Sequence, residues 1–360
     1  MRDLLSAITA VVCVSLLLPP SAGAADLPAA LVTEEFMVEA GDPGIQLYVR
    51  NKHPADMAQV PAGHVLLYVH GSTLPSEATF DVALDGLSWM DYIAGHGWDV
   101  YLMDVRGYGR STRAPAFAEA KVGEAPVVWT DMKVQDVGAV VDFIRQRRGV
   151  DRISLLGWSW GTVVTGAYAS TRGDEIGSLV LYAPVWCAGP CDFDPDLAQR
   201  LAAAHAEGQE TAAVVVQTMA QARRRIQAGV PESELDALMP PVWFETWAAA
   251  TLATDPVGAR QDPPVLRSPA GVSQDSGDYW GAGKSYYDPK GITAPTLAVV
   301  GEWDAVTPPD RARALYDALA NSRQRRFVEI KEGTHALLLE KNRMALFEAV
   351  QRFLDEAGAP

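Results

Sequence analysis

The sequence predicts an α/β fold in which a mostly parallel sheet is covered by helices on both faces. Three observations support this class. Strand-like runs alternate with amphipathic helical stretches along most of the 360 residues. Several of these runs are apolar nearly throughout, as in strands that are buried on both faces. The composition, with 48% hydrophobic and 21% charged residues, is that of a soluble globular protein and excludes disorder and multiple membrane spans.

The first half of the chain alternates regularly. The expected strands are Ile45–Arg50, His64–His70, Asp99–Asp104, Ile153–Leu156 and Ser178–Tyr182. Apolar residues recur at helical spacing between them, and the expected helices are Leu84–Ala94, Asp131–Arg147 and a helix that starts near Trp160.

The alternation stops between Val185 and Asp288. Ala-rich helical patterns over Leu197–Ala206 and Thr211–Gln227 precede a segment rich in Pro, Gly and aromatic residues. The core pattern then resumes with a strand at Thr296–Val300, a helix from Pro309, a strand at Arg326–Ile330 and a helix at Lys341–Glu356. We therefore expect a helical cap over residues 186–288, inserted between two strands of a core formed by residues 25–185 and 289–360.

Residues 1–24 are predicted to be a signal peptide. Arg2 is followed by an apolar stretch from Leu4 to Leu18, which is shorter than the ~20 residues of a membrane span. Ala22-Gly23-Ala24 then offers a signal peptidase cleavage pattern. We expect a protein that is secreted or periplasmic, without stable membrane insertion.

The charge balance limits the partners. Forty-five acidic and 30 basic residues leave a formal net charge of −15, which repels nucleic acid. The longest basic run, Arg223–Arg225, is interpreted as a solvated helix face. We expect a small-molecule substrate and no cofactor; the oligomeric state is left open.

Of the three cysteines, Cys187 and Cys191 lie outside the expected signal peptide. In an oxidising compartment they can form a disulfide, and two free thiols are the alternative. A metal site that combines them with Asp192, Asp194 and His205 is a weaker third interpretation, because no second ligand pair has metal-like spacing. We therefore predict no metal.

The pentapeptide Gly157-Trp158-Ser159-Trp160-Gly161 is the strongest local signal for chemistry. It follows a buried strand and precedes a helix, and its glycines permit the sharp turn that exposes a nucleophilic serine. The amides at the start of that helix favour a developing negative charge. Ser159 is thus the expected nucleophile.

A serine nucleophile needs a base and an orienting carboxylate. His335 lies between the last expected strand and the last helix, and Asp304 follows the preceding strand. The order Ser159, Asp304, His335 is the one expected for this arrangement. Glu302 and Asp192 are reserve candidates for the acid.

The oxyanion hole is expected from backbone N–H groups of Ser72 and Trp160, since His70-Gly71-Ser72-Thr73 follows the first long buried strand. Each donor is worth roughly 3 kcal/mol of transition-state stabilisation. His70 is expected to pack and orient its loop. The turn from Asp104 to Ser111 is interpreted as structural, with Arg106 holding neighbouring loops.

These motifs occur in the order seen in the α/β-hydrolase superfamily, and the resemblance covers about Val38 to Ala357. It implies an α/β-hydrolase fold with the insertion as its cap. The elbow is similar to that of proline iminopeptidases, although those usually carry His-Gly-Gly-Pro-Gly where this chain has His70-Gly-Ser-Thr-Leu-Pro75. Haloalkane dehalogenases and epoxide hydrolases resemble it in layout but place Asp at the position of Ser159.

The leading functional prediction is an exported serine hydrolase that cleaves a carboxylic ester or lactone through an acyl-enzyme. An aminopeptidase or amidase and a carbon–carbon bond hydrolase need the same triad, so the fold does not separate them. A noncatalytic binding protein on this scaffold is the alternative of a different class. Selectivity is expected from the cap, where aromatic residues can wall an apolar pocket. The expected pocket residues are Trp158, Trp186, Tyr279 and Trp280.

Overall fold

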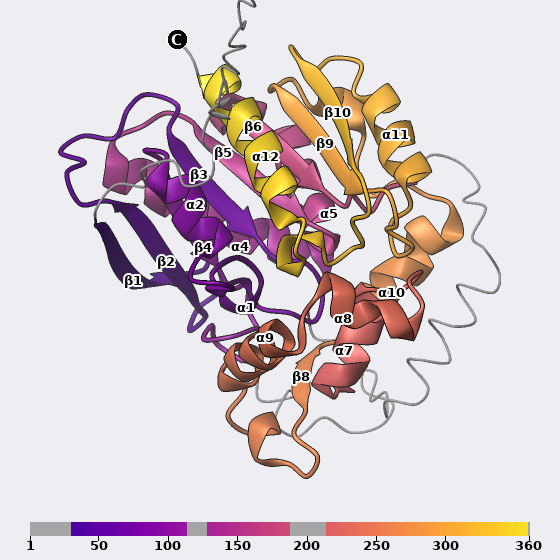
Figure 1. Ribbon diagram of the computed structural model, residues 1–360. Coiled ribbons are helices and arrows are strands. Elements are labelled where there is room, and N and C mark those ends of the chain that lie inside the picture. The colour runs from indigo at the N-terminus through magenta and orange to yellow at the C-terminus, as the bar shows by residue number, and fades with distance from the viewer. Residues whose placement is uncertain (1–29, 114–127, 188–213, 359–360) are drawn as a thin grey trace, which may run out of the picture.

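A computed structural model describes residues 30–113, 128–187 and 214–358. Eight strands form one sheet in the order β1-β2-β4-β3-β5-β6-β9-β10 (Figure 1). Its strands are β1 (Leu31–Glu39), β2 (Gln46–Pro54), β3 (Val65–Val69), β4 (Asp99–Met103), β5 (Ile153–Trp158), β6 (Ile176–Tyr182), β9 (Thr296–Gly301) and β10 (Arg325–Ile330). The β1–β2 and β2–β4 pairs are antiparallel and all other pairs are parallel. The expected mostly parallel sheet is confirmed.

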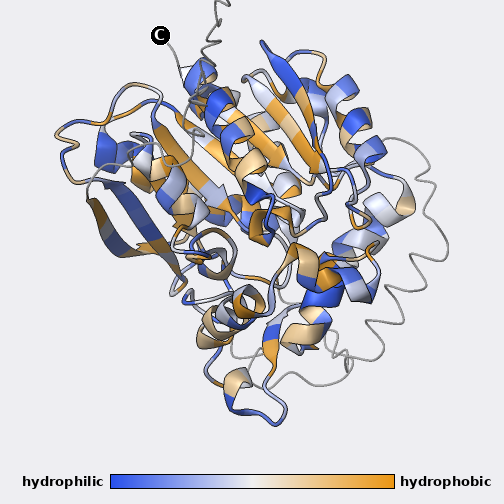
Figure 2. Cartoon of the chain, viewed as in Figure 1, coloured by the Kyte–Doolittle hydropathy of each residue, from blue (hydrophilic) through white to orange (hydrophobic). Residues whose placement is uncertain are grey.

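Helices cover both faces of this sheet. On one face lie α1 (Ser76–Phe80), α2 (Trp89–Gly95) and α12 (Arg343–Gly358), and on the other lie α4 (Thr130–Arg148), α5 (Trp160–Thr171) and α11 (Pro309–Ala318). Alternate residues of β3 serve the two layers: Leu66 and Tyr68 pack toward α2 and α12, whereas Val65, Leu67 and Val69 pack toward α4 and α5. Two apolar faces explain why the central strands are hydrophobic throughout (Figure 2).

The expected insertion lies between β6 and β9. Its described elements are β7 (Val214–Gln217), α7 (Met219–Ile226), α8 (Leu235–Leu238), α9 (Pro241–Ala253), β8 (Leu266–Pro269) and α10 (Gly271–Asp278). Most of them gather at one end of the sheet, at the bottom of Figure 1. The expected helix over Leu197–Ala206 lies outside the described residues.

The insertion is not wholly helical, because β7 and β8 pair as an antiparallel ribbon. The prediction of one helix over Thr211–Gln227 was therefore wrong in its first part. Three consecutive valines from Val214 favour a strand, since β-branched side chains are stiff and suit a pleated surface. The helix begins only after Thr218, whose hydroxyl accepts the N–H of Gln221 at 3.2 Å in a capping box.

One further strand and one helix start also differ from the sequence prediction. Strand β1 was not anticipated, because its side chains are mostly exposed or half-buried and its charged residues mask the alternation. The helix expected over Leu84–Ala94 starts at Trp89. Ser88 caps it, accepting the N–H of Asp91 at 2.9 Å.

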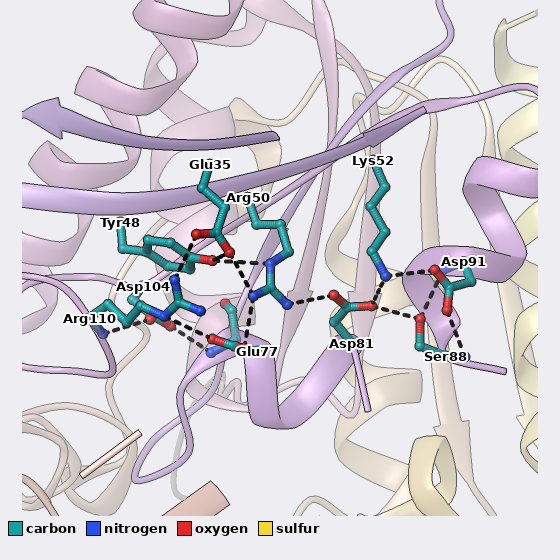
Figure 3. A network of polar contacts seen from close by, with 11 residues as sticks. Glu35, Tyr48, Arg50, Lys52, Glu77, Asp81, Ser88, Asp91, Asp104 and Arg110 are labelled. Carbon is teal, nitrogen blue, oxygen red and sulfur yellow. Dashed lines mark hydrogen bonds and ion pairs between the residues drawn. The ribbon is translucent and has the colours of Figure 1, made fainter. Parts of the chain in front are cut away.

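A charged network ties α1 to the antiparallel edge of the sheet (Figure 3). Arg50 on β2 bridges Glu35 at 2.9 Å, Glu77 at 2.8 Å and Asp81 at 2.8 Å. Asp104, at the end of β4, accepts the backbone N–H of Ser76 at 2.8 Å. These contacts fix the start of α1, and α1 follows the loop that carries the expected oxyanion donor.

In the three described stretches, no helix is both long enough and apolar enough to cross a membrane. The expected signal peptide, residues 1–24, lies outside the described residues. Export therefore stays a prediction.

Candidate active site

Ser159 occupies a sharp turn between β5 and α5. Its backbone has φ 55° and ψ −126°, a combination that side-chain-bearing residues rarely adopt. The turn is held by the Ser159 N–H, which donates to the carbonyl of Tyr182 at 3.0 Å. The Ser159 residue is 6% exposed. The expected strand–turn–helix context of the pentapeptide is present.

The two flanking glycines are required by close approach. A Cβ at Gly157 would lie 2.5 Å from the carbonyl oxygen of Gly161. A Cβ at Gly161 would lie 2.4 Å from the carbonyl oxygen of Val69, at the end of β3. The glycines therefore let α5 pack directly against the strand ends, which holds Ser159 above the sheet.

His335 and Asp304 meet at the carboxyl ends of β10 and β9. Nδ1 of His335 lies 2.8 Å from Oδ2 of Asp304, and both side chains are buried. Because the carboxylate can only accept, Nδ1 carries the proton and Nε2 is left with its lone pair. Nε2 is buried and has no hydrogen-bond partner among the described residues. This tautomer leaves Nε2 ready to accept a proton.

Thr307 lies in the loop after β9 that carries Asp304, and the sequence did not identify it as a site residue. Its hydroxyl donates to Oδ2 of Asp304 at 2.9 Å and lies 3.3 Å from Nδ1 of His335. The backbone N–H groups of Val306 and Thr307 donate to Oδ1 at 2.9 and 2.7 Å. An Asp followed three residues later by Thr is a turn-forming pattern that could have identified it.

Glu302, one of the two reserve acids, does not take this position. Glu302 pairs with Lys331 at 2.6 Å and accepts the N–H of Glu332 at 3.1 Å. Hydrogen bonding to Lys331 lowers the pKa of the Glu302 carboxyl. Asp192 lies outside the described residues. Of the two described candidates, only Asp304 contacts His335.

Hydrogen bonds from β5, β6 and Glu340 hold the loop that carries His335. The indole N–H of Trp158 and the hydroxyl of Tyr182 donate to the carbonyl oxygen of His335 at 3.2 and 3.1 Å. The buried Glu340 accepts the N–H of Thr334 at 3.1 Å, and burial raises the pKa of its carboxyl. The rings of Trp158 and His335 lie 5.3 Å apart, so the residue before Ser159 directly contacts His335.

The loop after β3 approaches Ser159 from the other side. A Cβ at Gly71 would lie 3.0 Å from Cβ of Ser159. Ser72 comes next, and Trp160 is the first residue of α5, whose N–H has no partner within the helix. Trp160 therefore follows Ser159 directly in the chain, and Ser72 follows the glycine that approaches it; their role as oxyanion donors stays a prediction.

His70 packs and orients this loop, as expected. Nδ1 lies 2.7 Å from the carbonyl oxygen of Gly71, and Nε2 accepts the N–H of Val105 at 3.2 Å. Burial, with the nearby charge of Lys133, holds the pKa of His70 well below its usual value. Arg106 is likewise structural, donating from Nε to Asp136 at 2.9 Å and from Nη1 to Asp42.

The four expected pocket residues divide between the two apolar layers of the core. Trp158 is 1% exposed and belongs to the apolar layer of α2 and α12. Trp186, Tyr279 and Trp280 pack in the opposite layer, beside α4 and α5. Their role as the wall of a substrate pocket stays a prediction.

The cysteine prediction is only partly covered by the structure. Cys187 is buried and disulfide-bonded. Cys191, the expected partner, lies outside the described residues, as do Asp194 and His205. In the described part of the chain, no group of three or more His, Cys, Asp or Glu could hold a metal ion.

One surface cavity of the described residues lies away from the triad. Its volume is about 780 Å³, and it lies at the amino ends of the parallel strands, lined by residues such as Gly63, Ile153 and Pro295. Ligands of parallel sheets bind at the carboxyl ends of the strands. We therefore assign the candidate site to the opposite edge, where the loops after β3, β5, β9 and β10 meet.

Comparison with known proteins agrees with this architecture. Residues 65–342 match a family model described as the alpha/beta hydrolase fold. A search of curated proteins finds no match. Many solved structures are similar.

Among these structures is a thermophilic esterase from Thermogutta terrifontis, with 18% sequence identity, a TM-score of 0.58, and coverage of 91% of this chain and 100% of the esterase. A hydrolase from Pseudomonas aeruginosa shows 20% identity, a TM-score of 0.58 and coverage of 88% and 97%. A bromoperoxidase from Bacillus anthracis shows 17% identity, a TM-score of 0.60 and coverage of 89% and 100%. At these identities the likeness concerns the fold.

Proposed function

The chain belongs to the α/β-hydrolase fold family, and we propose that it is an exported serine hydrolase that cleaves a carboxylic ester or lactone. The observation that carries the proposal is the Asp304–His335 pair beside a serine on a strained turn. The pair has a 2.8 Å contact, and Nε2 has no hydrogen-bond partner among the described residues. Esterases and lipases among the similar folds agree with this class.

Acylation begins when Oγ of Ser159 attacks the carbonyl carbon of the ester and passes its proton to Nε2 of His335. The carbonyl oxygen becomes an oxyanion, and the N–H groups of Ser72 and Trp160 donate to it. Asp304 stabilises the imidazolium and holds its orientation. Collapse of the intermediate breaks the bond to the alcohol oxygen, which takes the proton from Nε2.

Deacylation repeats these steps with water. The water attacks the acyl carbon while Nε2 accepts its proton, and the second tetrahedral intermediate uses the same two donors. Its collapse breaks the bond between the acyl carbon and Oγ of Ser159, Oγ takes the proton back from Nε2 of His335, and the carboxylic acid leaves. No described hydrogen bond joins Oγ to Nε2, and such contacts often tighten only with substrate bound.

A fluorophosphonate probe tests the nucleophile. Wild type should be labelled and should hydrolyse chromogenic esters, whereas Ser159→Ala should lose both properties and keep its circular dichroism spectrum. Undiminished labelling of Ser159→Ala would exclude this serine. A panel of ester chain lengths with aminoacyl anilides alongside measures ester against amide preference, and faster anilide cleavage would replace the ester assignment.

Export is tested separately. Material recovered from the periplasm or the medium should begin at Ala25 by intact mass, since cleavage is expected after Ala24. A chain that keeps Met1 and fractionates with the cytoplasm would refute export without affecting the proposed chemistry.

A further inference from the structure

Helix α7 of the insertion packs against the loops that carry the triad. The carbonyl oxygen of Ile226, its last residue, accepts the hydroxyl of Thr334, next to His335, at 3.3 Å. In the turn that follows, a Cβ at Gly229 would lie 2.8 Å from Cβ of Ala305, next to Asp304. The end of this helix therefore lies at the edge of the candidate site.

The three arginines of α7 have different surroundings, so the interpretation of Arg223–Arg225 as a solvated face was wrong for two of them. Arg223 pairs with Asp236 at 2.9 Å, and Arg224 is exposed. Arg225 lies next to Ile226 and three residues after Ala222, both buried, so it lies beside the buried side of the helix.

Arg225 reaches the loop of the expected oxyanion hole. Its Nη2 donates to the hydroxyl of Thr73, the residue after Ser72, and Thr73 has a positive φ of 67°. Its Nε is buried and has no hydrogen-bond partner among the residues that the structure describes. No carboxylate of the described residues pairs with this guanidinium, and burial lowers its pKa to about 10, so it stays charged at neutral pH.

A second basic side chain, the fully buried Lys133, also lies near Tyr108. Nζ of Lys133 is 5.4 Å from the ring centroid of Tyr108 and 3.7 Å from that of Trp160, and it has no hydrogen-bond partner in the described part of the chain. The Tyr108 hydroxyl lies 3.5 Å from the N–H of Thr73. Two basic side chains thus lie near the oxyanion loop without an ion pair to any described residue, in a protein whose formal net charge is −15.

We propose that Arg225 binds an anionic group of the substrate, a carboxylate or a phosphate, beside the Ser72–Thr73 loop. A buried charge without a counterion is unfavourable, and an anion that carries its own charge into the site compensates it. The planar guanidinium, with donors left over after the contact to Thr73, suits both oxyacids. This inference rests on the proposed ester hydrolysis and adds that the ester is negatively charged.

Two pairs of esters test the charge preference. The acyl side is tested with 4-nitrophenyl hydrogen glutarate against 4-nitrophenyl 5-methylhexanoate, which has the same branching without the charge. The alcohol side is tested with the acetate esters of 4-hydroxybenzoate and 4-hydroxybenzamide. Wild type should prefer the charged member of at least one pair in kcat/KM.

The variant Arg225→Met should lower this charged-to-neutral ratio by about 10- to 100-fold, as expected for loss of a charge-assisted hydrogen bond. Arg225→Lys should keep part of the preference, because it keeps the charge without the planar donors. The matched control is Arg224→Met on the same helix, which should keep the wild-type ratio. A ratio unchanged by Arg225→Met in both pairs would overturn the proposal.

Calorimetric titration with glutarate and with inorganic phosphate separates this inference from the proposed function. If no ester is hydrolysed, the proposed function fails, but binding of either anion by wild type and not by Arg225→Met still supports the anion site. Stronger binding of one anion identifies the carboxylate or the phosphate. Absence of binding by wild type, together with absence of charge preference, refutes the site. Should Arg225→Met fail to fold, Arg225→Lys and Arg224→Met carry the same comparison.

Discussion

Replacing Lys133 with Met should stabilise the protein at neutral and acidic pH. Lys133 is 0% exposed, and burial lowers the pKa of its ammonium group from 10.5 to about 7. A difference of this size corresponds to roughly 5 kcal/mol of penalty for keeping the side chain charged in the folded state. The contact with the Trp160 ring at 3.7 Å offsets about 1–2 kcal/mol of it, so the expected gain is about 3 kcal/mol.

The gain should depend on pH in a defined direction. The pKa of the folded state lies below that of the unfolded state, so between pH 7 and 10.5 the unfolded chain binds more protons and wild-type stability rises with pH. The penalty is fully present below about pH 7 and disappears toward 10.5. The advantage of Lys133→Met should therefore shrink by up to about 1.4 kcal/mol per pH unit across this window.

Urea denaturation followed by tryptophan fluorescence, at a series of pH values from 6 to 9, measures the difference. Lys284→Met is the control, since Lys284 is exposed and should give a small difference that does not change with pH. A constant difference between wild type and Lys133→Met over the whole range would show that the ammonium group is hydrated in the folded protein and would refute the reasoning.

The remaining predictions concern the site and its supports. Gly161→Ala should destabilise by about 1–3 kcal/mol and lower kcat, because the new methyl group would lie 2.4 Å from the carbonyl oxygen of Val69; unchanged melting and turnover would contradict this. Asp304→Asn should lower kcat by up to ~10⁴-fold, while Glu302→Gln should stay within about threefold on the same ester; the reverse outcome would mean that the acid is misassigned. Burial raises the pKa of Asp104 from 3.8 to about 6, so the folded state binds more protons than the unfolded state between these values. The free energy of unfolding of wild type should therefore fall by about 3 kcal/mol, relative to Asp104→Asn, as the pH rises from 3.8 to 6; parallel stability curves in urea denaturation would argue against it.

Much of the fold could be predicted because it depends on local patterns. The central strands are apolar on both faces, which the sequence displays directly in runs such as Val65–Val69. The turn at Ser159 was predictable for a similar reason, since both glycines and the flanking strand and helix are adjacent in the chain. Strand β7 was missed because three valines inside an Ala-rich stretch read equally well as helix until their pairing with β8 is known.

The candidate triad was predictable in its order along the chain but not in its contacts. Glu302 and Asp304 lie two residues apart in one loop, and sequence does not tell which carboxylate faces His335. The tertiary structure places Asp304 at 2.8 Å and directs Glu302 to Lys331. Thr307 and Glu340 support the two loops through contacts that depend on how the strands end.

What the sequence by itself determined is therefore the fold class, the elbow and the order of the chemical groups, because each follows from spacing within one segment. What only the tertiary structure decided is which neighbour each polar side chain meets. Arg223, Arg224 and Arg225 are identical and consecutive, yet one is paired, one is exposed and one is half-buried without a carboxylate partner among the described residues. Their difference arises because α7 packs against the loops that carry Thr73 and Thr334. The partners that compensate the charge of each side chain are therefore set by residues distant in sequence.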